Sequence, residues 1–151
     1  MRQILTQNQL FEISLKAIIK NNRGEILILK CRDNGKLAGY YDIPGGRIQT
    51  GEVGMALEKI LKREIVEEVG DIQLEINPRI VTYGWHDRPD KIDGQRELIW
   101  FFFEAEYLGG EIKISSEHSD WKWQKLDKNN LEKFFIRGPL DGMRNYFQDN
   151  K

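Results

Sequence analysis

Apolar and polar residues alternate near the start of the chain, between residues 11 and 17, with Glu12, Ser14 and Lys16 at the polar positions. A period of two is typical of a strand with one face buried and the other in solvent. A turn signal follows at residues 21–24, and residues 26–29 form a short apolar run. Together these segments predict a β-hairpin.

The period changes further along the chain. Leu57, Leu61 and Ile65 recur every four residues, which is the spacing of the buried stripe of an amphipathic helix. Glycine is common just past the end of a helix. We therefore expect a helix that begins near Met55 and ends at Gly70.

The second half of the chain predicts more strands and then helices. Residues 98–103 are apolar at every position, which suits a central strand covered on both faces. The later elements are long strands at 74–85 and 97–107 around a polar loop at 86–95, a short strand at 121–123, and helices at 126–135 and 140–147 separated by Arg137-Gly138-Pro139. This order predicts an α/β fold in which a mixed sheet lies between helices.

Three glutamates lie on one face of the predicted helix. Glu64, Glu67 and Glu68 occupy positions i, i+3 and i+4, so their carboxylates are neighbours. Like charges at this spacing destabilise a helix, and a bound cation would reverse that penalty. Carboxylate oxygens suit Mg²⁺ or Mn²⁺, but solvated helices also carry several glutamates, so the cluster alone leaves both interpretations open.

A glycine turn and a basic residue precede this helix. Pro44-Gly45-Gly46 permits a sharp turn whose backbone can approach a ligand closely. Arg47 follows directly and provides a guanidinium suited to phosphate. With Glu52 and the acidic helix, this loop predicts a site for a metal-bound phosphate chain.

Residues 46–71 resemble the Nudix box, the motif of the Nudix hydrolase family, whose pattern is G-x5-E-x7-R-E-U-x-E-E-x-G-U with U a bulky apolar residue. The matching residues are Gly46, Glu52, Arg63, Glu64, Ile65, Glu67, Glu68 and Gly70. Ten residues instead of seven separate Glu52 from Arg63, and Asp71 stands at the final apolar position. The resemblance implies the Nudix fold, an α/β/α sandwich with a mixed sheet between helices.

The resemblance also assigns roles to individual residues. The implied metal ligands are the carbonyl of Gly45 and the carboxylates of Glu64, Glu67 and Glu68. Arg63 is expected to orient those carboxylates through charged hydrogen bonds. The candidate phosphate contacts are Arg47, Lys30 and Arg32, although the last two also suit solvated side chains beside a loop. The three-residue insertion nearly preserves helical phase, so whether Glu52 faces the site stays open.

A further acid is expected in a loop before the last strand. Residues 115–121 resemble the corresponding segment of the family, and Glu117 is the candidate general base or additional metal ligand, with Asp120 as the alternative. His118 and His86 are interpreted as structural or loop-exposed residues, although the loop of His86 could also overhang the pocket.

The resemblance implies metal-assisted hydrolysis of a phosphoanhydride in a nucleoside diphosphate derivative, with Mg²⁺ or Mn²⁺ as the cofactor. For a compact single domain we favour a (deoxy)nucleoside triphosphate, oxidised ones included, cleaved to the monophosphate and pyrophosphate. ADP-ribose, dinucleoside polyphosphates and nucleotide sugars are the alternatives. Residues outside the box that suit base stacking or specificity are Tyr40, Tyr83, Trp85, Trp121 and the loop Asp87-Arg88-Pro89-Asp90.

Functions of two other classes remain open. A non-catalytic nucleotide-binding regulatory module would share the fold, although degenerate family members usually lack box glutamates that are present here. An isoprenyl diphosphate isomerase would need a reactive cysteine, for which Cys31 is the only candidate. Capped or triphosphorylated RNA also remains as a substrate class, although no basic stripe supports nucleic-acid binding.

Composition and charge set the wider context. The 151 residues are expected to form a single Nudix hydrolase domain spanning residues 1–151. A net charge of −1 and the lack of a long apolar run favour neither nucleic acid nor a membrane as partner. The single cysteine and the lack of an apolar signal core predict a cytoplasmic protein. We expect a monomer or homodimer that binds a small-molecule nucleotide.

Overall fold

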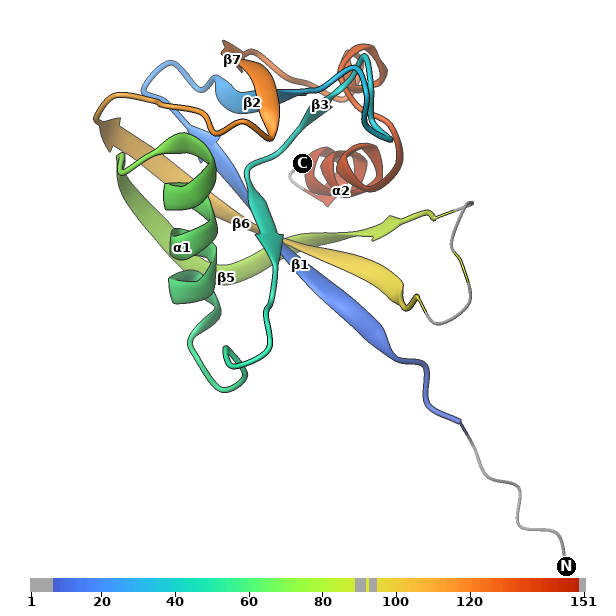
Figure 1. Cartoon of the computed structure of the whole chain (residues 1–151). Helices are drawn as coiled ribbons and strands as arrows, with labels where there is room; N and C mark the ends of the chain where they lie inside the picture. The colour runs from blue at the N-terminus through green and yellow to red at the C-terminus, as the bar shows by residue number, and fades with distance from the viewer. Residues whose placement is uncertain (1–6, 89–91, 93–94, 150–151) are drawn as a thin grey trace, which may run out of the picture.

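The computed structural model describes residues 7–88, 92 and 95–149 (Figure 1). This part of the chain forms a seven-stranded mixed sheet with helices on both faces. The strands are β1 (Phe11–Lys20), β2 (Ile26–Cys31), β3 (Tyr41–Asp42), β4 (Gly45–Arg47), β5 (Gln73–His86), β6 (Glu97–Gly109) and β7 (His118–Gln124). The helices are α1 (Leu57–Val69), α2 (Arg137–Asp149) and the short 3-10 helix η1 (Leu131–Lys133).

The centre of the sheet is a parallel pair of strands. β1 pairs with β6 along its whole length, from Phe11 opposite Glu97 to Lys20 opposite Glu106. β5 pairs antiparallel with the other side of β6. The free side of β1 pairs first with β4 and then with β2, and β2 also pairs with β3 and β7. The glycine turn of β4 therefore lies against the middle of β1.

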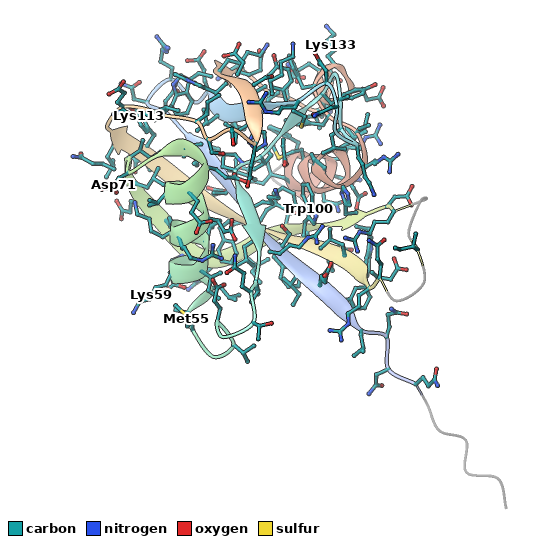
Figure 2. All side chains as sticks on the ribbon, viewed as in Figure 1. Met55, Lys59, Asp71, Trp100, Lys113 and Lys133 are labelled. Atoms are coloured by element: carbon teal, nitrogen blue, oxygen red, sulfur yellow. The ribbon has the colours of Figure 1, made fainter. Side chains whose placement is uncertain are left out.

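Each face of the sheet carries its own apolar core. On one face, α1 packs through Ile60, Leu61 and Ile65 against β1 and β6. On the other face, α2 and η1 pack against a second cluster that includes Trp100 and Phe102 of β6. Figure 2 labels Trp100 in the middle of the molecule, beside α2. The predicted sandwich of a mixed sheet between helices is confirmed.

Most of the predicted elements are present. β1 and β2 form the predicted hairpin, and α1 begins at Leu57, two residues after the expected start, because Gly54 adopts a φ of +92° and residues 52–55 form a turn. The helix ends where expected, since Gly70 follows it with a φ of +92°. The predicted strands at 74–85, 97–107 and 121–123 correspond to β5, β6 and β7.

The prediction that β1 has a solvent-exposed face is wrong over much of the strand. Ser14 and Lys16 are only 3% and 4% exposed. Both line a cavity on the α2 side of the sheet, so the polar positions of β1 face an internal site instead of bulk solvent.

The predicted helix at 126–135 is also wrong, because only η1 forms within it. Side chains of Asp127 and Asn130 accept hydrogen bonds from backbone N–H groups of residues 129 and 127, at 2.7 and 2.9 Å. Such local side-chain bonds compete with helix formation.

The last helix is longer than predicted. α2 begins at Arg137 and includes Gly138 and Pro139, which were expected to separate two helices. Proline is tolerated in the first turn of a helix, where its missing N–H has no intrahelical partner to lose. Among the residues described, no helix is both long and apolar enough to cross a membrane.

Candidate active site

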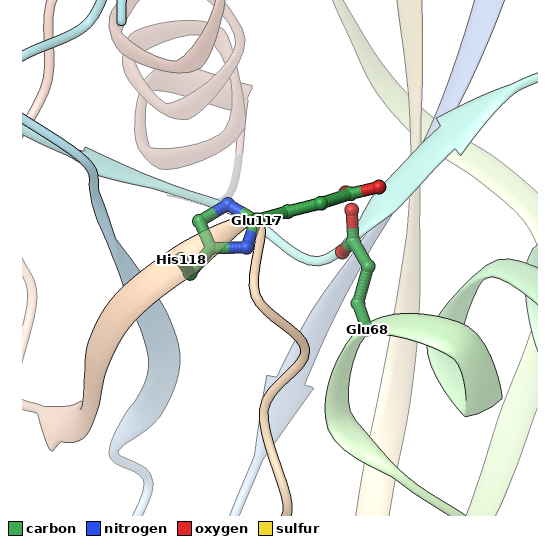
Figure 3. Close-up of side chains that lie close together, drawn as sticks. All are labelled: Glu68, Glu117 and His118. Atoms are coloured by element: carbon green, nitrogen blue, oxygen red, sulfur yellow. The ribbon is translucent and has the colours of Figure 1, made fainter. Parts of the chain in front are cut away.

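Two acidic residues from distant parts of the chain meet at the end of α1. The segment before β7 runs along this end, where the Ser115 N–H donates to the carbonyl of Glu68 at 2.9 Å. Figure 3 shows the carboxylate of Glu68 directed toward Glu117, with His118 beside them. One ligand atom from each of these three residues lies within 4.8 Å of the others, a group that could hold a metal ion. We call it the Glu68–Glu117–His118 group.

The carboxylate of Glu68 is held in an unusual environment. It is 7% exposed, and its Oε2 accepts a hydrogen bond from the Gly45 N–H at 2.9 Å. Burial raises the pKa of Glu68 to about 8, and the nearby Lys16 only partly opposes this shift. A buried carboxylate beside the second acid Glu117 is a donor set that a divalent cation would stabilise, so the residues fit the metal that the box implies.

Neither glycine of the turn could carry a side chain, because neighbouring atoms lie too close to its backbone. A Cβ on Gly45, which has a φ of +146°, would lie 1.9 Å from the Leu15 carbonyl oxygen. A Cβ on Gly46 would lie 2.2 Å from Oε2 of Glu64. The absence of side chains therefore lets the turn pack between β1 and α1, with its backbone against two of the helix carboxylates.

Arg63 binds three acids at once. Its Nε lies 2.6 Å from Oε1 of Glu52, its Nη2 lies 2.7 Å from Glu64, and its Nη1 lies 3.1 Å from Glu67. Despite the three-residue insertion, Glu52 therefore still lies beside the acidic helix, in contact with Arg63. Glu64 and Glu67 point to Arg63, and Glu68 is the helix glutamate in the Glu68–Glu117–His118 group.

A cavity of about 400 Å³ adjoins this group. Glu117 and His118, which belong to the group, also line the cavity. Two predicted phosphate contacts, Arg32 and Arg47, lie on its wall. Arg32 donates to the carbonyl of Ser116, and a guanidinium nitrogen of Arg47 lies 3.4 Å from Glu12. Acidic and basic side chains therefore share one cavity, as a metal-bound polyphosphate would require.

Other predicted residues are not brought to the cavity. Lys30 and Asp120 lie opposite each other in the β2–β7 pair, away from its wall. None of the four aromatic candidates, all of them described residues, lines it: Tyr40, Tyr83, Trp85 and Trp121. In the candidate specificity loop, Pro89 and Asp90 lie outside the described residues.

Sequence reasoning did not single out Lys16, Asp42 and Trp100, which lie on the cavity wall. Lys16 lies 3.3 Å from Asp42 and its Nζ lies 4.2 Å from the centre of the Trp100 ring. The ring of His86 stacks on Trp100, with centroids 4.9 Å apart and planes 5° apart. The only signals were a lysine on an apolar strand and an aspartate beside the Pro-Gly-Gly turn.

Of the two interpretations of the histidines, the loop-exposed one is wrong. His118 is 7% exposed and belongs to the Glu68–Glu117–His118 group, so it is not a loop-exposed residue. His86, the last residue of β5, is half-buried and lines the cavity. Burial lowers the pKa of both, which keeps their imidazoles neutral near pH 7. A neutral imidazole can serve as a metal ligand.

Cys31 also lines the cavity, but its thiol is not activated. Burial raises the pKa of Cys31 to about 12, so the thiol stays protonated at neutral pH. A reactive cysteine needs a lowered pKa. The environment of Cys31 therefore argues against the isomerase alternative.

The chain is similar in sequence to known proteins. The model of the NUDIX domain family matches residues 11–140. Nucleoside triphosphatase NudI of Escherichia coli strain K12 is 32% identical over 120 residues, which span 72% of this chain and 77% of the relative.

Solved structures share the fold. A MutT protein from Methanosarcina mazei Go1 has a TM-score of 0.70 at 24% identity, with 95% of each chain covered. The ORF135 protein of E. coli has a TM-score of 0.68 at 17% identity, covering 94% of this chain and 92% of that one. The similarity extends over almost the whole chain in both cases.

Proposed function

Because the chain belongs to the Nudix hydrolase family, we propose that it hydrolyses nucleoside triphosphates to the monophosphate and pyrophosphate. The family match supports hydrolysis of a nucleotide phosphoanhydride. The choice of triphosphates is supported by the relative at 32% identity, which is named as a nucleoside triphosphatase. A cytoplasmic enzyme acting on small nucleotides fits the single, protonated thiol of Cys31.

One observation carries the proposal. The Glu68–Glu117–His118 group opens on a cavity of about 400 Å³ whose wall also contains Arg32 and Arg47. Small-molecule sites typically have volumes of about 300–1,000 Å³. Carboxylates and guanidinium groups that meet at one cavity complement a polyphosphate that carries divalent cations.

The metal is proposed to be Mg²⁺ or Mn²⁺, since oxygen ligands outnumber the one imidazole. Glu68, Glu117 and His118 would hold it, with Glu64 available beside Gly46. When bound, the cation would neutralise phosphate charge and lower the pKa of a water.

The chain's own groups supply the remaining functions. The Gly45 N–H fixes the carboxylate of Glu68, and Arg63 fixes those of Glu64 and Glu67. Arg47 and Arg32 are proposed to bind the phosphates and to stabilise charge on the leaving pyrophosphate. Glu117 is the more exposed acid of the group, so it is the one placed to accept a proton from the attacking water. The water oxygen bonds to phosphorus as the phosphoanhydride P–O bond breaks.

The proposal is tested by pyrophosphate and phosphate release from a nucleotide panel, with Mg²⁺ and with EDTA. The panel contains canonical and oxidised triphosphates, ADP-ribose, nucleotide sugars and dinucleoside polyphosphates. We expect metal-dependent turnover of triphosphates that falls at least about 100-fold in Glu68→Gln, because the variant loses a charged ligand.

Glu58→Gln is the matched control, because Glu58 lies on the same helix and outside the Glu68–Glu117–His118 group. It should keep the wild-type rate. Absence of turnover across the panel, or equal rates in wild type and Glu68→Gln, would refute the proposal.

A further inference from the structure

Three rows of paired residues cross the sheet on the face that α1 covers. They run from β1 through β6 to β5 and consist of Ala17–Phe103–Ile80, Leu15–Phe101–Tyr83 and Ile13–Ile99–Trp85. Residues that pair directly across neighbouring strands point to the same face of a sheet. Leu15 and Phe103 belong to the apolar core under α1, so the rows lie on that face.

The cover that α1 provides ends before the rows reach β5. The β1 members Ala17 and Leu15 are fully buried. The β5 members are about half exposed, with exposed fractions of 46% for Ile80, 48% for Tyr83 and 53% for Trp85. Figure 1 shows the ends of β1, β5 and β6 extending past α1. We call these three β5 residues the β5 strip, and contiguous exposed apolar surface of this kind marks an interaction site.

A groove continues from the β5 strip. It has a volume of about 510 Å³ and lies between the sheet and the loop at residues 49–55, before α1. Phe11 links the two surfaces, because it lines the groove and its ring centre lies 5.6 Å from that of Trp85. On the loop side the groove is lined by Val53 and Met55, which are 89% and 48% exposed. The strip and the groove therefore form one continuous surface.

The edge of β5 beside the strip is closed to a further strand. The Trp85 N–H donates to Oδ2 of Asp141 at 2.8 Å, and both groups are therefore occupied. The Tyr83 carbonyl accepts from Nδ2 of Asn145, also at 2.8 Å. Pro78, in the same strand, has no N–H to donate. A partner therefore binds this surface through side chains and does not extend the sheet.

A second copy of the chain is the partner that this surface fits. The strip and the groove lie side by side, so two copies related by a two-fold axis can each place the strip in the groove of the other. A net charge of −1 causes little repulsion between copies. The groove wall also carries charges of both signs, from Glu12, Glu52 and Arg96. A two-fold contact brings such charges face to face.

The exposed area is large enough for a dimer. Phe11, Val53, Met55 and the strip together expose on the order of 600 Å² of mainly apolar side chain, given that a large aromatic residue buries about 150–250 Å². A standard interface buries about 800 Å² per partner and has a polar rim around an apolar centre. The charged groups of the groove wall supply such a rim.

We propose that this surface is a homodimer interface, in which the β5 strip of each copy packs into the groove of the other. The strip and the loop that carries the groove lie outside the wall of the cavity beside the Glu68–Glu117–His118 group. Dimerisation therefore does not depend on the proposed hydrolysis, and either can fail without the other.

Analytical ultracentrifugation of the full chain, between about 1 and 200 µM, tests the proposal. We expect a dimer with a Kd on the order of 10 µM. Trp85→Glu should weaken association at least about 10-fold, because it places a charge in the apolar centre. Leu108→Glu is the matched control and should leave Kd unchanged, since Leu108 is 55% exposed and lies outside the strip and the groove. A wild-type monomer at about 200 µM, or equal Kd values for wild type and Trp85→Glu, would overturn the proposal.

A mixing experiment tests the pairing of strip with groove. Val53→Lys should also weaken association at least about 10-fold, and an exposed loop position tolerates it without loss of the fold. In a mixed dimer of Trp85→Glu and Val53→Lys, one contact brings the two introduced charges together and the other keeps the original side chains. The mixture should therefore dimerise more tightly than either variant alone.

Circular dichroism checks that both variants are folded. Folded variants that stay monomeric when mixed would overturn the pairing of strip with groove. If Trp85→Glu does not fold, Val53→Lys decides alone, and a Kd equal to that of wild type would overturn the proposal.

Discussion

Glu68 is a buried acid whose pKa is set by its position in the fold. Its burial raises the pKa of the carboxyl to about 8 from an ordinary value of 4.5. The protein keeps this acid buried beside Glu117, an arrangement that costs stability whenever both are charged and no cation is present. Such a cost at a single residue is typical of a functional site.

The residue-scale prediction concerns stability and pH in the absence of metal. With a pKa of about 8 in the folded protein, Glu68 keeps its proton over most of the range from pH 5 to 8, in which the unfolded chain loses it. The free energy of unfolding should therefore fall as pH rises through this range, by up to about 1.4 kcal/mol per pH unit. Glu68→Gln should remove this slope and be more stable than wild type at pH 8.

Urea unfolding in EDTA at pH 5, 6, 7 and 8 measures the effect, with Glu58→Gln as the control for loss of a carboxylate on the same helix. Identical pH slopes in wild type and Glu68→Gln would show that Glu68 is charged in the metal-free fold. Adding Mg²⁺ should reduce the wild-type slope, because a cation favours the charged form.

Individual site residues differed in how far the sequence could reveal them. Glu68 lies within the Nudix box and Gly45 directly precedes it, so local pattern was enough to name both as candidates. Lys16 and Asp42 carry no such pattern, because their significance comes from a contact across 26 positions of the chain. The alternation of polar and apolar residues along a strand does not distinguish a polar face in solvent from a polar face that lines a cavity.

The helix α2 packs closely against the sheet through glycines. A Cβ on Gly142 would lie 2.1 Å from a ring carbon of Phe102, which is fully buried. A Cβ on Gly84 of β5 would lie 2.6 Å from the backbone nitrogen of Gly142. The helix therefore touches β5 and β6 at positions where only glycine fits.

The element-scale prediction follows from this contact. Gly142→Ala should lower the free energy of unfolding by about 1–3 kcal/mol, because overpacking the Phe102 ring outweighs the gain in helix propensity. Gly35→Ala is the control, since its Cβ would make an ordinary 3.5 Å contact. Chemical denaturation compares the two variants, and a Gly142→Ala protein as stable as wild type would mean that α2 sits farther from the sheet.

Elements with a strong period were predicted well, and those decided by side-chain bonds were not. α1 and the β1–β2 hairpin follow from spacing and turn residues. The segment 126–135 contains enough apolar residues for a helix, but Asp127 and Asn130 hold its backbone in turns. Conversely, Pro139 looked like a break and instead lies in the first turn of α2.

At the scale of the whole molecule, the active site exists only because distant segments meet. The Glu68–Glu117–His118 group joins α1 to β7, and residues from β1 to β6 line the cavity beside it. The sequence identified Glu117 as a candidate, but its approach to Glu68 depends on the 113–115 segment bonding to the end of α1. The fold was predictable from motif and period, whereas the sequence indicated only some residues of the cavity wall, such as Arg32, Arg47 and Glu117.

The most direct test of the account is Mn²⁺ binding followed by electron paramagnetic resonance, because it asks whether the Glu68–Glu117–His118 group is the metal centre. We predict that wild type and Glu58→Gln bind Mn²⁺ equally well. Glu68→Gln and Glu117→Gln should bind at least about 10-fold more weakly, since each loses a charged ligand. Equal Mn²⁺ affinity in wild type, Glu68→Gln and Glu117→Gln would contradict the account.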